Sequence, residues 1–346
     1  MPKLLFFLFF PVLVFAQQKN NYTNLVLEGG GVRGLAYAGA FSVLEEKGIL
    51  QKIERVAGSS AGAIAGILVC VGYTAKEIDS IMHKLPVQQF NDGKGGIIGK
   101  YKRVKKRFGI YEGKKFEAWL LETVKEKTGN ENLSFAELHQ LHLKNSSYKD
   151  LYCTGTNLSR QKLEVFSFEH TPDMPITLAV RISGSVPLYF EPVLLDNQKQ
   201  KIKKGDTVSY ANYFVDGGMM CNYPISMFDT CENNDNPLLC SQVKFNTHTI
   251  GIKLERPEQI DSLQKNNITI PPYLVHNLNQ YLAAFSNLVM ETLNRKYPSL
   301  ENEKGRTIYV SYGKINSKVR KMKPLEKQQL FDNGVKAAND FLTNTH

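Results

Sequence analysis

Two adjacent serines lie in the stretch Gly58-Ser59-Ser60-Ala61-Gly62, between a short apolar run and a run of helix-forming residues. The stretch matches the pattern G-x-S-x-G, which in a strand-to-helix turn exposes the Oγ of the central serine at the carboxyl end of a sheet. Gly58 and Gly62 satisfy the need for small residues where such a turn crowds the neighbouring backbone. We therefore predict that Ser60 is a nucleophile and that Ser59 is a packing or hydrogen-bonding neighbour, although the pattern alone also occurs by chance.

A glycine-rich loop lies one predicted strand earlier in the chain. Its glycines permit positive φ angles and leave no Cβ in the way of a ligand, and N–H groups at the start of the following helix attract anions. The loop could cradle a phosphate, form an oxyanion hole or be a plain tight turn, and it matches neither the dinucleotide-binding nor the P-loop pattern. Because two such turns rarely coincide in one strand-helix-strand unit, we favour an oxyanion hole beside Ser60. Its residues are Gly29, Gly30, Gly31, Val32, Arg33 and Gly34.

A nucleophilic serine needs a proton acceptor. In the stretch YFVDGGMMCNYP, Asp216 follows an apolar strand and precedes Gly217 and Gly218, a position from which its carboxylate can point into a cleft. An ordinary Asp-Gly turn is the alternative interpretation. A Ser-His-Asp triad of the α/β-hydrolase type also remains open, and its leading histidines are His170 and His248, in loop or strand surroundings.

Three motifs occur in order along the chain: GGGxRG from Gly29 to Gly34, GxSxG from Gly58 to Gly62, and DGG from Asp216 to Gly218. A weaker fourth segment, SGSVPLYFEP from Ser183 to Pro192, combines small residues, a proline, and a phenylalanine before a second proline. On these motifs the sequence resembles the patatin-like phospholipase family, from about Asn24 to near the C-terminus.

The resemblance implies a serine acyl hydrolase with a two-residue catalytic centre and without a metal or cofactor. Ser60 would attack an ester carbonyl of a lipid while Asp216 takes its proton, and backbone N–H groups from Gly30 to Val32 would hold the oxyanion. A water activated by Asp216 would then hydrolyse the acyl-enzyme. Arg33 is assigned a structural hydrogen bond rather than a chemical step. The competing interpretations are the triad enzyme and a non-enzymatic lipid-binding protein.

The apolar periodicity predicts an α/β fold. Residues 24–30 and 53–58 have the pattern of short buried strands, each followed by helical spacing, which indicates a βαβ unit with a parallel sheet. Together with the resemblance, this predicts a three-layer α/β/α patatin-like fold, with a central mostly parallel sheet and helices on both faces, in one domain over residues 24–346. Later helices are expected at 114–127, 134–143, 176–183, 272–296 and 324–342, and later strands at 148–158, 162–168, 210–218, 247–254 and 306–312.

Residues 1–16 have the features of a secretory signal peptide: a basic start, an apolar stretch from Leu4 to Phe15, and a small-x-small pattern that ends at Ala16. The apolar run is shorter than the roughly 20 residues that span a bilayer. We therefore expect cleavage after Ala16, a short N-terminal segment at 17–23, and export to a periplasm or to the medium.

Export affects the interpretation of the cysteines. In an oxidising compartment Cys231 and Cys240, which flank the polar loop CENNDNPLLC, could form a local disulfide. Cys70 and Cys153 lie in apolar segments and are expected to be buried thiols. No spacing of cysteines and histidines suggests a zinc site.

Composition and charge limit the class of protein. With 346 residues, 42% of them hydrophobic and 22% charged, the chain is an ordinary globular protein and not a disordered or fibrous one. The net charge of +10 is concentrated in the clusters Lys100–Arg107, Lys199–Lys204 and Lys314–Lys323. Such clusters suit nucleic acid or anionic lipid, or are solvated loops. Export favours lipid, so we expect a lipid substrate at a membrane surface and no nucleic acid.

Overall fold

The structure of the chain is a computed structural model that describes residues 21–344, apart from 86, 203–209, 232–235, 241–242, 318–319 and most positions between 266 and 302. The expected signal peptide at 1–16 lies outside the described residues, as does most of the helix expected at 272–296. Within the described ranges, no helix is both long and apolar enough to cross a bilayer.

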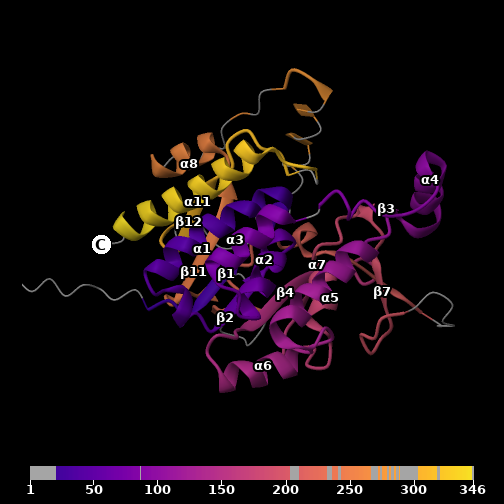
Figure 1. Ribbon diagram of the computed structural model, residues 1–346, viewed down its shortest axis with the longest axis horizontal. Helices are drawn as coiled ribbons and strands as arrows, with labels where there is room; N and C mark the ends of the chain where they lie inside the picture. Colours follow the sequence, from indigo (N-terminus) through magenta and orange to yellow (C-terminus); the bar gives the residue numbers. More distant parts are fainter. Residues whose placement is uncertain are drawn as a thin grey trace, which may run out of the picture.

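An eight-stranded sheet forms the centre of the molecule (Figure 1). The five strands from β12 to β4 run parallel to their neighbours, whereas β5, β8 and β7 pair antiparallel. The α/β class and the mostly parallel central sheet predicted from the sequence are therefore confirmed. The strands in spatial order are β12 (Thr307–Ser311), β11 (Thr249–Glu255), β1 (Asn24–Leu27), β2 (Arg55–Gly58), β4 (Asp150–Asn157), β8 (Asn212–Asp216) and β7 (Val193–Leu195), with β5 (Lys162–Phe166) paired to β4.

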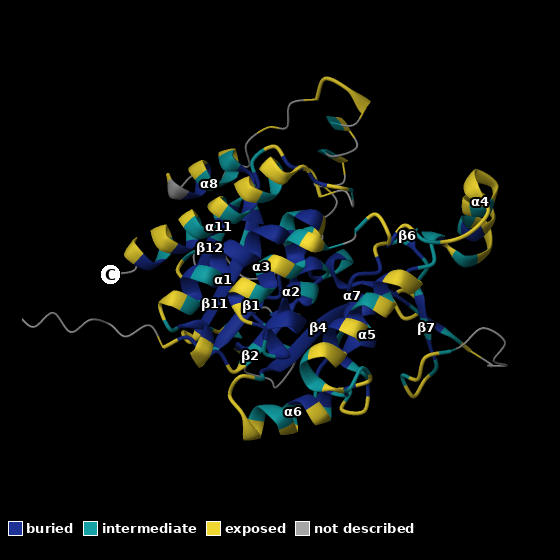
Figure 2. Ribbon diagram, viewed as in Figure 1, coloured by how far each residue is buried: buried dark blue, intermediate teal, exposed yellow. Residues whose placement is uncertain are grey.

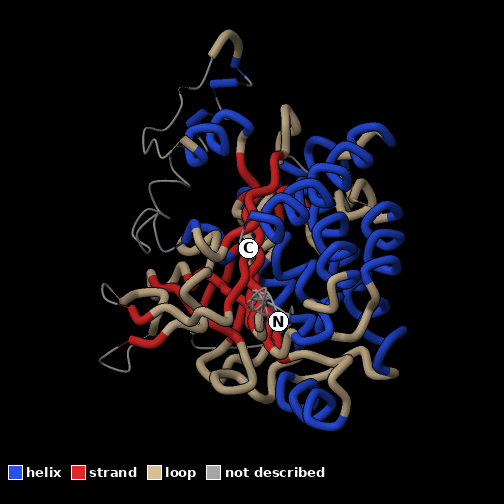
Figure 3. Tube along the Cα trace, turned by 90° about the vertical axis from the view of Figure 1, so that its left-hand side faces the viewer, coloured by secondary structure: helices blue, strands red, loops and turns tan. Residues whose placement is uncertain are grey.

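Most helices lie on one side of this sheet, and fewer lie on the other (Figure 3). Parallel neighbours such as β1 and β2 require a crossover connection, and the helix between them covers the sheet. The helices are α1 (Ala36–Glu46), α2 (Ala61–Cys70), α3 (Ala75–Lys84), α4 (Gly96–Arg107), α5 (Lys114–Thr128), α6 (Phe135–Lys144), α7 (Ile176–Ser183), α8 (Pro257–Gln264) and α11 (Pro324–Asn344), with 3₁₀ turns η1 (Gly31–Leu35), η2 (Leu50–Lys52) and η3 (Gly217–Met219). Two short pairs stand apart from the sheet: β3 (Gly109–Tyr111) with β6 (Leu188–Phe190), and β9 (Thr230–Cys231) with β10 (Val243–Lys244).

The alternation of side chains along the short central strands divides the core between the two faces. Leu25 and Leu27 of β1 belong to the large cluster under the helices. Val26 points the other way and packs in a smaller cluster with Tyr223 and Phe228, from the segment after β8. All three β1 side chains are fully buried, and Figure 2 shows the sheet as the buried centre of the molecule.

The last helix packs against the first. A Cβ added to Gly39 of α1 would lie 2.0 Å from the Phe331 oxygen of α11, and one added to Gly334 of α11 would lie 2.2 Å from the Ala36 oxygen. Glycine at both positions lets the two helix backbones approach directly. The α1–α11 contact places the end of the described chain beside the first βαβ unit.

Cys231 and Cys240 form the local disulfide that the sequence left open. The remaining cysteines, Cys70, Cys153 and Cys221, are buried free thiols. Burial raises the pKa of the Cys221 thiol from 9.0 to about 12, so this group stays protonated at neutral pH and is an unreactive packing residue.

Candidate active site

Ser60 lies in the turn between β2 and α2, in a conformation that L-residues rarely adopt. Its φ of 50° and ψ of −118° are those of a strained non-glycine residue. A Cβ on Gly58 would lie 2.4 Å from the Gly62 carbonyl carbon, and a Cβ on Gly62 would lie 2.2 Å from the Leu27 oxygen. The two glycines of the G-x-S-x-G pattern are thus required by crowding within the turn and against β1.

Ser60 Oγ donates a hydrogen bond of 2.6 Å to Asp216 Oδ2, although 156 positions separate the two residues. Asp216 is the last residue of β8, and Oδ1 of the same carboxylate accepts a 2.7 Å hydrogen bond from the N–H of Gly218. A Cβ on Gly217 would lie 2.1 Å from Thr154 Oγ1 of β4, so this turn also needs glycine to bring the carboxylate against the sheet. The two residues that the sequence singled out for chemistry are in direct contact.

The carboxylate of Asp216 is buried, with 5% of the residue exposed. Burial raises its pKa from 3.8 to about 6, against the lowering effect of the hydrogen bonds from Ser60 and Gly218. The group is therefore mostly ionised at neutral pH, yet it is a stronger base than an exposed aspartate.

The glycine loop lies beside Ser60, and its N–H groups differ in their partners. Gly29 donates its N–H to the Asn222 oxygen at 2.9 Å, and Arg33 donates its N–H to the Gly30 oxygen at 3.2 Å. Gly31 has a positive φ of 57° and, with Val32, lines the same cavity as Ser60. Among the hydrogen bonds of the described residues, none has the N–H of Gly30, Gly31 or Val32 as its donor. These three N–H groups, rather than those of Gly29 and Arg33, are the candidate donors for an oxyanion.

Side chains that the motifs did not single out hold this loop in place. Asn222 Nδ2 donates to the Gly29 oxygen at 3.0 Å and to Glu28 Oε1 at 3.3 Å. Burial raises the pKa of Glu28 from 4.5 to about 8, and its Oε2 accepts the Leu254 N–H at 2.8 Å. Asn222 lies four residues after Gly218, within the stretch DGGMMCNYP, and this closeness to the motif is the signal from which its role could have been predicted. Glu28 directly precedes the loop, but its type alone gave no signal.

Arg33 points away from the chemistry. Its Nε donates to the Ile315 oxygen at 2.8 Å, and its guanidinium carbon lies 3.5 Å from the centre of the Tyr312 ring. This is the structural hydrogen bond expected from the sequence. Gly34, the last residue of the motif, packs against the turn, because a Cβ there would lie 3.1 Å from the Ala61 Cβ.

Three further serines support the pair. Ser59 is fully buried and donates to the Cys221 oxygen at 2.6 Å, which agrees with its expected role as a hydrogen-bonding neighbour. Ser183 Oγ accepts the Ser60 N–H at 2.9 Å, and the Ser185 oxygen accepts the Asp216 N–H at 2.9 Å. The segment SGSVPLYFEP therefore contacts both members of the pair.

A cavity of about 80 Å³, open to solvent, leads to Ser60. Its walls are almost wholly apolar and come from the glycine loop, α2, α3, α5 and the segment around β6. Val186 and Phe190 belong to this lining, so part of the stretch VPLYF borders the cavity, as considered from the sequence. An apolar lining beside a serine suits the hydrocarbon part of an ester.

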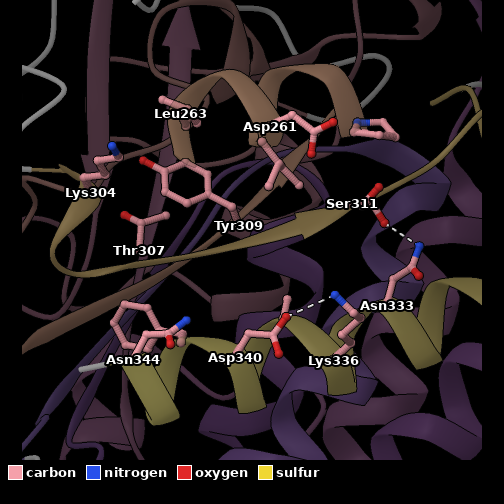
Figure 4. A pocket seen from close by; sticks show the side chains of 14 residues that line it. Asp261, Leu263, Lys304, Thr307, Tyr309, Ser311, Asn333, Lys336, Asp340 and Asn344 are labelled. Atoms are coloured by element: carbon pink, nitrogen blue, oxygen red, sulfur yellow. Dashed lines mark hydrogen bonds and ion pairs between the residues drawn. The ribbon is translucent and has the colours of Figure 1, made fainter. Parts of the chain in front are cut away.

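Another cavity, of about 510 Å³, lies at the far edge of the sheet between α8, β12 and α11 (Figure 4). Polar side chains such as Asp340 and Lys336 line it, and these two pair with each other at 3.1 Å. None of the motif residues borders it. We therefore assign the chemistry to the smaller cavity at Ser60.

The histidines proposed for a triad lie elsewhere. His170 Nδ1 is 2.8 Å from Ser167 Oγ, and His248 Nδ1 is 2.7 Å from the Asn21 oxygen. Among the hydrogen bonds of the described residues, none joins a histidine to Ser60 or Asp216. The arrangement that the triad interpretation requires is therefore not found at His170 or His248.

The fold and the site together define an α/β protein in which a strand-to-helix turn presents a serine to a buried aspartate beside a glycine loop. The family model described as patatin-like phospholipase matches residues 25–229. The chain belongs to the patatin-like phospholipase family. Fold and family support a lipid acyl hydrolase.

Related chains agree with this assignment. YqhO of Bacillus subtilis, described as uncharacterized, is 33% identical over 60% of this chain and 67% of its own length. The probable lipid hydrolase 463L of Invertebrate iridescent virus 6 is 26% identical over 64% of this chain and 68% of its own length. The matches thus span about two thirds of each relative.

Solved structures share the fold at low sequence identity. VipD from Legionella pneumophila has a TM-score of 0.57 at 18% identity, covering 94% of this chain and 67% of its own. The type III effector protein ExoU has a TM-score of 0.50 at 19% identity, covering 94% of this chain and 53% of its own.

Proposed function

We propose that this chain is an exported lipid acyl hydrolase of the phospholipase A or lysophospholipase type, with Ser60 as nucleophile and Asp216 as general base. The observation that carries the proposal is the 2.6 Å hydrogen bond from Ser60 Oγ to a buried carboxylate at the end of an apolar cavity. A carboxylate with a pKa of about 6 accepts a proton more readily than one near 3.8.

The proposed acylation step uses the contact between Ser60 and Asp216. Ser60 Oγ forms a bond to the ester carbonyl carbon, its proton passes to Asp216 Oδ2, and the carbonyl oxygen becomes the oxyanion. The N–H groups of Gly30, Gly31 and Val32 donate to that oxygen, and loss of one such donor typically costs about 10²–10³ in rate. The intermediate collapses when the alcohol leaves with the proton from Asp216, and the acyl group remains on Ser60.

Deacylation repeats the sequence with water. Asp216 takes a proton from a water molecule, the hydroxide adds to the acyl carbon, and Ser60 Oγ leaves with that proton as the fatty acid is released. Each step uses only groups of this chain, substrate and water. The apolar cavity favours fatty acyl esters, and the basic surface favours lipids presented in a membrane.

The test compares Ser60→Ala and Asp216→Asn with the parent. We expect both variants to lose at least about 100-fold in the release of fatty acid from p-nitrophenyl esters and phospholipid vesicles. Labelling by a fluorophosphonate should require Ser60. Activity close to that of the parent in either variant would falsify the assignment.

Export is the second part of the proposal. The basic start and apolar stretch of residues 1–16 support removal of a signal peptide after Ala16. Amino-terminal sequencing of the mature protein should begin at Gln17. A mature chain that begins at Met1 would contradict export by cleavage.

A further inference from the structure

Helix α4 extends away from the body of the molecule (Figure 1), and three of its apolar side chains are exposed. Ile97, Ile98 and Tyr101 are 86%, 70% and 67% exposed, whereas Arg103 is the one residue of the helix that is buried. A surface helix of a globular protein normally does the opposite, because apolar residues gain free energy by leaving water. The sequence indicated only a basic cluster here, and the structure makes it an outward-facing amphipathic helix.

Buried contacts of Arg103 fix this orientation. Its Nε donates to the Ile110 oxygen at 2.8 Å, and its Nη1 donates to the Lys94 oxygen at 2.6 Å. A Cβ on Gly93 would lie 2.6 Å from the guanidinium carbon, so the preceding turn closes tightly around this side chain. The two acceptors lie before and after the helix in the chain. Helix α4 therefore cannot turn its apolar face inward without breaking these hydrogen bonds.

Positive charge occupies the side of the helix opposite the apolar face. The twelve residues of α4 include six Lys or Arg and no acid. The side of the helix that faces the body borders a cavity of about 680 Å³, shared with the start of α5. Two acidic residues also border this cavity, and each already has a partner. Asp92 accepts a hydrogen bond from the Gly113 N–H at 2.8 Å, and Glu112 forms an ion pair with Lys114 at 2.6 Å. The cations in its lining are Lys94, Lys102, Arg103, Lys106, Arg107, Lys114 and Lys115.

The helix is also connected to the wall of the acyl cavity. Phe90 and Phe116, which precede and follow α4 in the chain, both line the cavity at Ser60. Strand β3 directly follows the helix and pairs with β6, and Phe190 of β6 is a third lining residue. A surface bound by α4 is therefore held next to the segments that border the acyl site.

We propose that α4 docks the protein on an anionic lipid surface. Ile97, Ile98 and Tyr101 enter the boundary between headgroups and acyl chains, while the cations of the cavity bind the lipid phosphates. The charge argues against a second copy of the chain as the occupant, since two such helices would repel each other. Exposed isoleucines argue against nucleic acid. Docking rests on the proposed function only in that the substrate is a lipid, and it can be measured without catalysis.

The experiment uses the full chain with Ser60→Ala, so that the vesicles are not consumed. Flotation is measured with vesicles of phosphatidylcholine alone and of phosphatidylcholine mixed with phosphatidylglycerol. We expect preferential binding to the mixed vesicles that weakens as salt is added. Lys102→Gln with Lys106→Gln should weaken binding about 30-fold, at about 1 kcal/mol for each cation. Ile97→Asn with Ile98→Asn should weaken it at least about tenfold.

The matched control is Leu325→Asn with Lys336→Gln, an exposed apolar residue and an exposed cation on α11, and it should bind as the parent does. With Ser60 restored, all α4 variants should hydrolyse a soluble short-chain ester at the parent rate, which shows that they are folded. If the parent were inactive toward every ester, the proposed function would be refuted, but the flotation experiment would still test docking.

Three results overturn the docking proposal. The parent binds neither vesicle, or binds both equally; the α4 variants bind the mixed vesicles as tightly as the parent; or sedimentation shows a parent dimer that Ile97→Asn with Ile98→Asn dissociates while vesicle binding persists.

Discussion

The replacement Asp216→Asn should abolish activity and at the same time stabilise the folded protein at neutral pH. Asparagine keeps the shape of the side chain, and its Oδ1 can still accept the Gly218 N–H. Its amide nitrogen can donate to Ser60 Oγ, which then acts as the acceptor. The variant therefore removes a buried negative charge while the hydrogen-bonding groups remain paired, and it removes the base.

The magnitude follows from the pKa of Asp216, which burial raises from 3.8 to about 6. Between these values the folded state holds a proton that the unfolded state has lost, so the free energy of unfolding falls as pH rises. Above the folded pKa the full difference of about two pKa units corresponds to about 3 kcal/mol, an upper limit because the buried amide is itself costly. Below the unfolded pKa this contribution disappears.

Urea denaturation of parent and variant at about pH 8 and about pH 4 measures the effect. We expect Asp216→Asn to be more stable than the parent at the higher pH, with the difference shrinking toward the lower pH. Glu28 and other acids titrate in both proteins and cancel in the comparison. In the parent, kcat/KM for a soluble ester should rise about tenfold per pH unit and level off above about pH 6. A variant that is less stable than the parent at about pH 8, or a difference that does not depend on pH, would refute the reasoning.

Three other predictions test the surroundings of the pair. Gly62→Ala should destabilise the fold by about 3 kcal/mol or more in urea denaturation, because its Cβ would lie 2.2 Å from a backbone oxygen of β1, whereas Gly305→Ala meets no atom within 4 Å and should be nearly neutral. Asn222→Ala should lower kcat roughly 10- to 100-fold with little change in KM, because it releases the glycine loop; an unchanged kcat would contradict this. Val186→Trp should raise KM for long-chain esters more than for short-chain esters in a chain-length series, because Val186 borders the apolar cavity.

Local patterns were sufficient to predict most of the parallel part of the fold. The strands β1 and β2 and the helices α1 and α2 follow the predicted segments, because short apolar runs that end in glycine mark the strands and the longer apolar runs after them mark the helices. The predicted helix at 176–183 coincides with α7. Helix α3 was not predicted, although its capping box between Thr74 and Glu77 is a local signal that the sequence carries.

Long-range pairing could not be predicted in the same way. The strand that carries Asp216 was expected, but its antiparallel direction beside β4 depends on which strands meet, and no local pattern encodes that choice. Outward-facing α4 was missed for a related reason. Its basic residues resemble a solvated loop, and the burial of Arg103 depends on carbonyl groups of Lys94 and Ile110 that only the folded chain brings together.

One physical property links the stability and the chemistry of the pair. Burial of the Asp216 carboxylate at the end of β8 lowers the free energy of unfolding at neutral pH. The same burial makes the carboxylate about 100-fold more basic than an exposed aspartate. In the proposed mechanism no histidine supplies basicity to the Ser–Asp pair, so this desolvation would take its place. Variants that admit water to Asp216 should therefore gain stability and lose rate together, because both changes follow from the same fall in pKa. A purely structural aspartate would show the first change without the second.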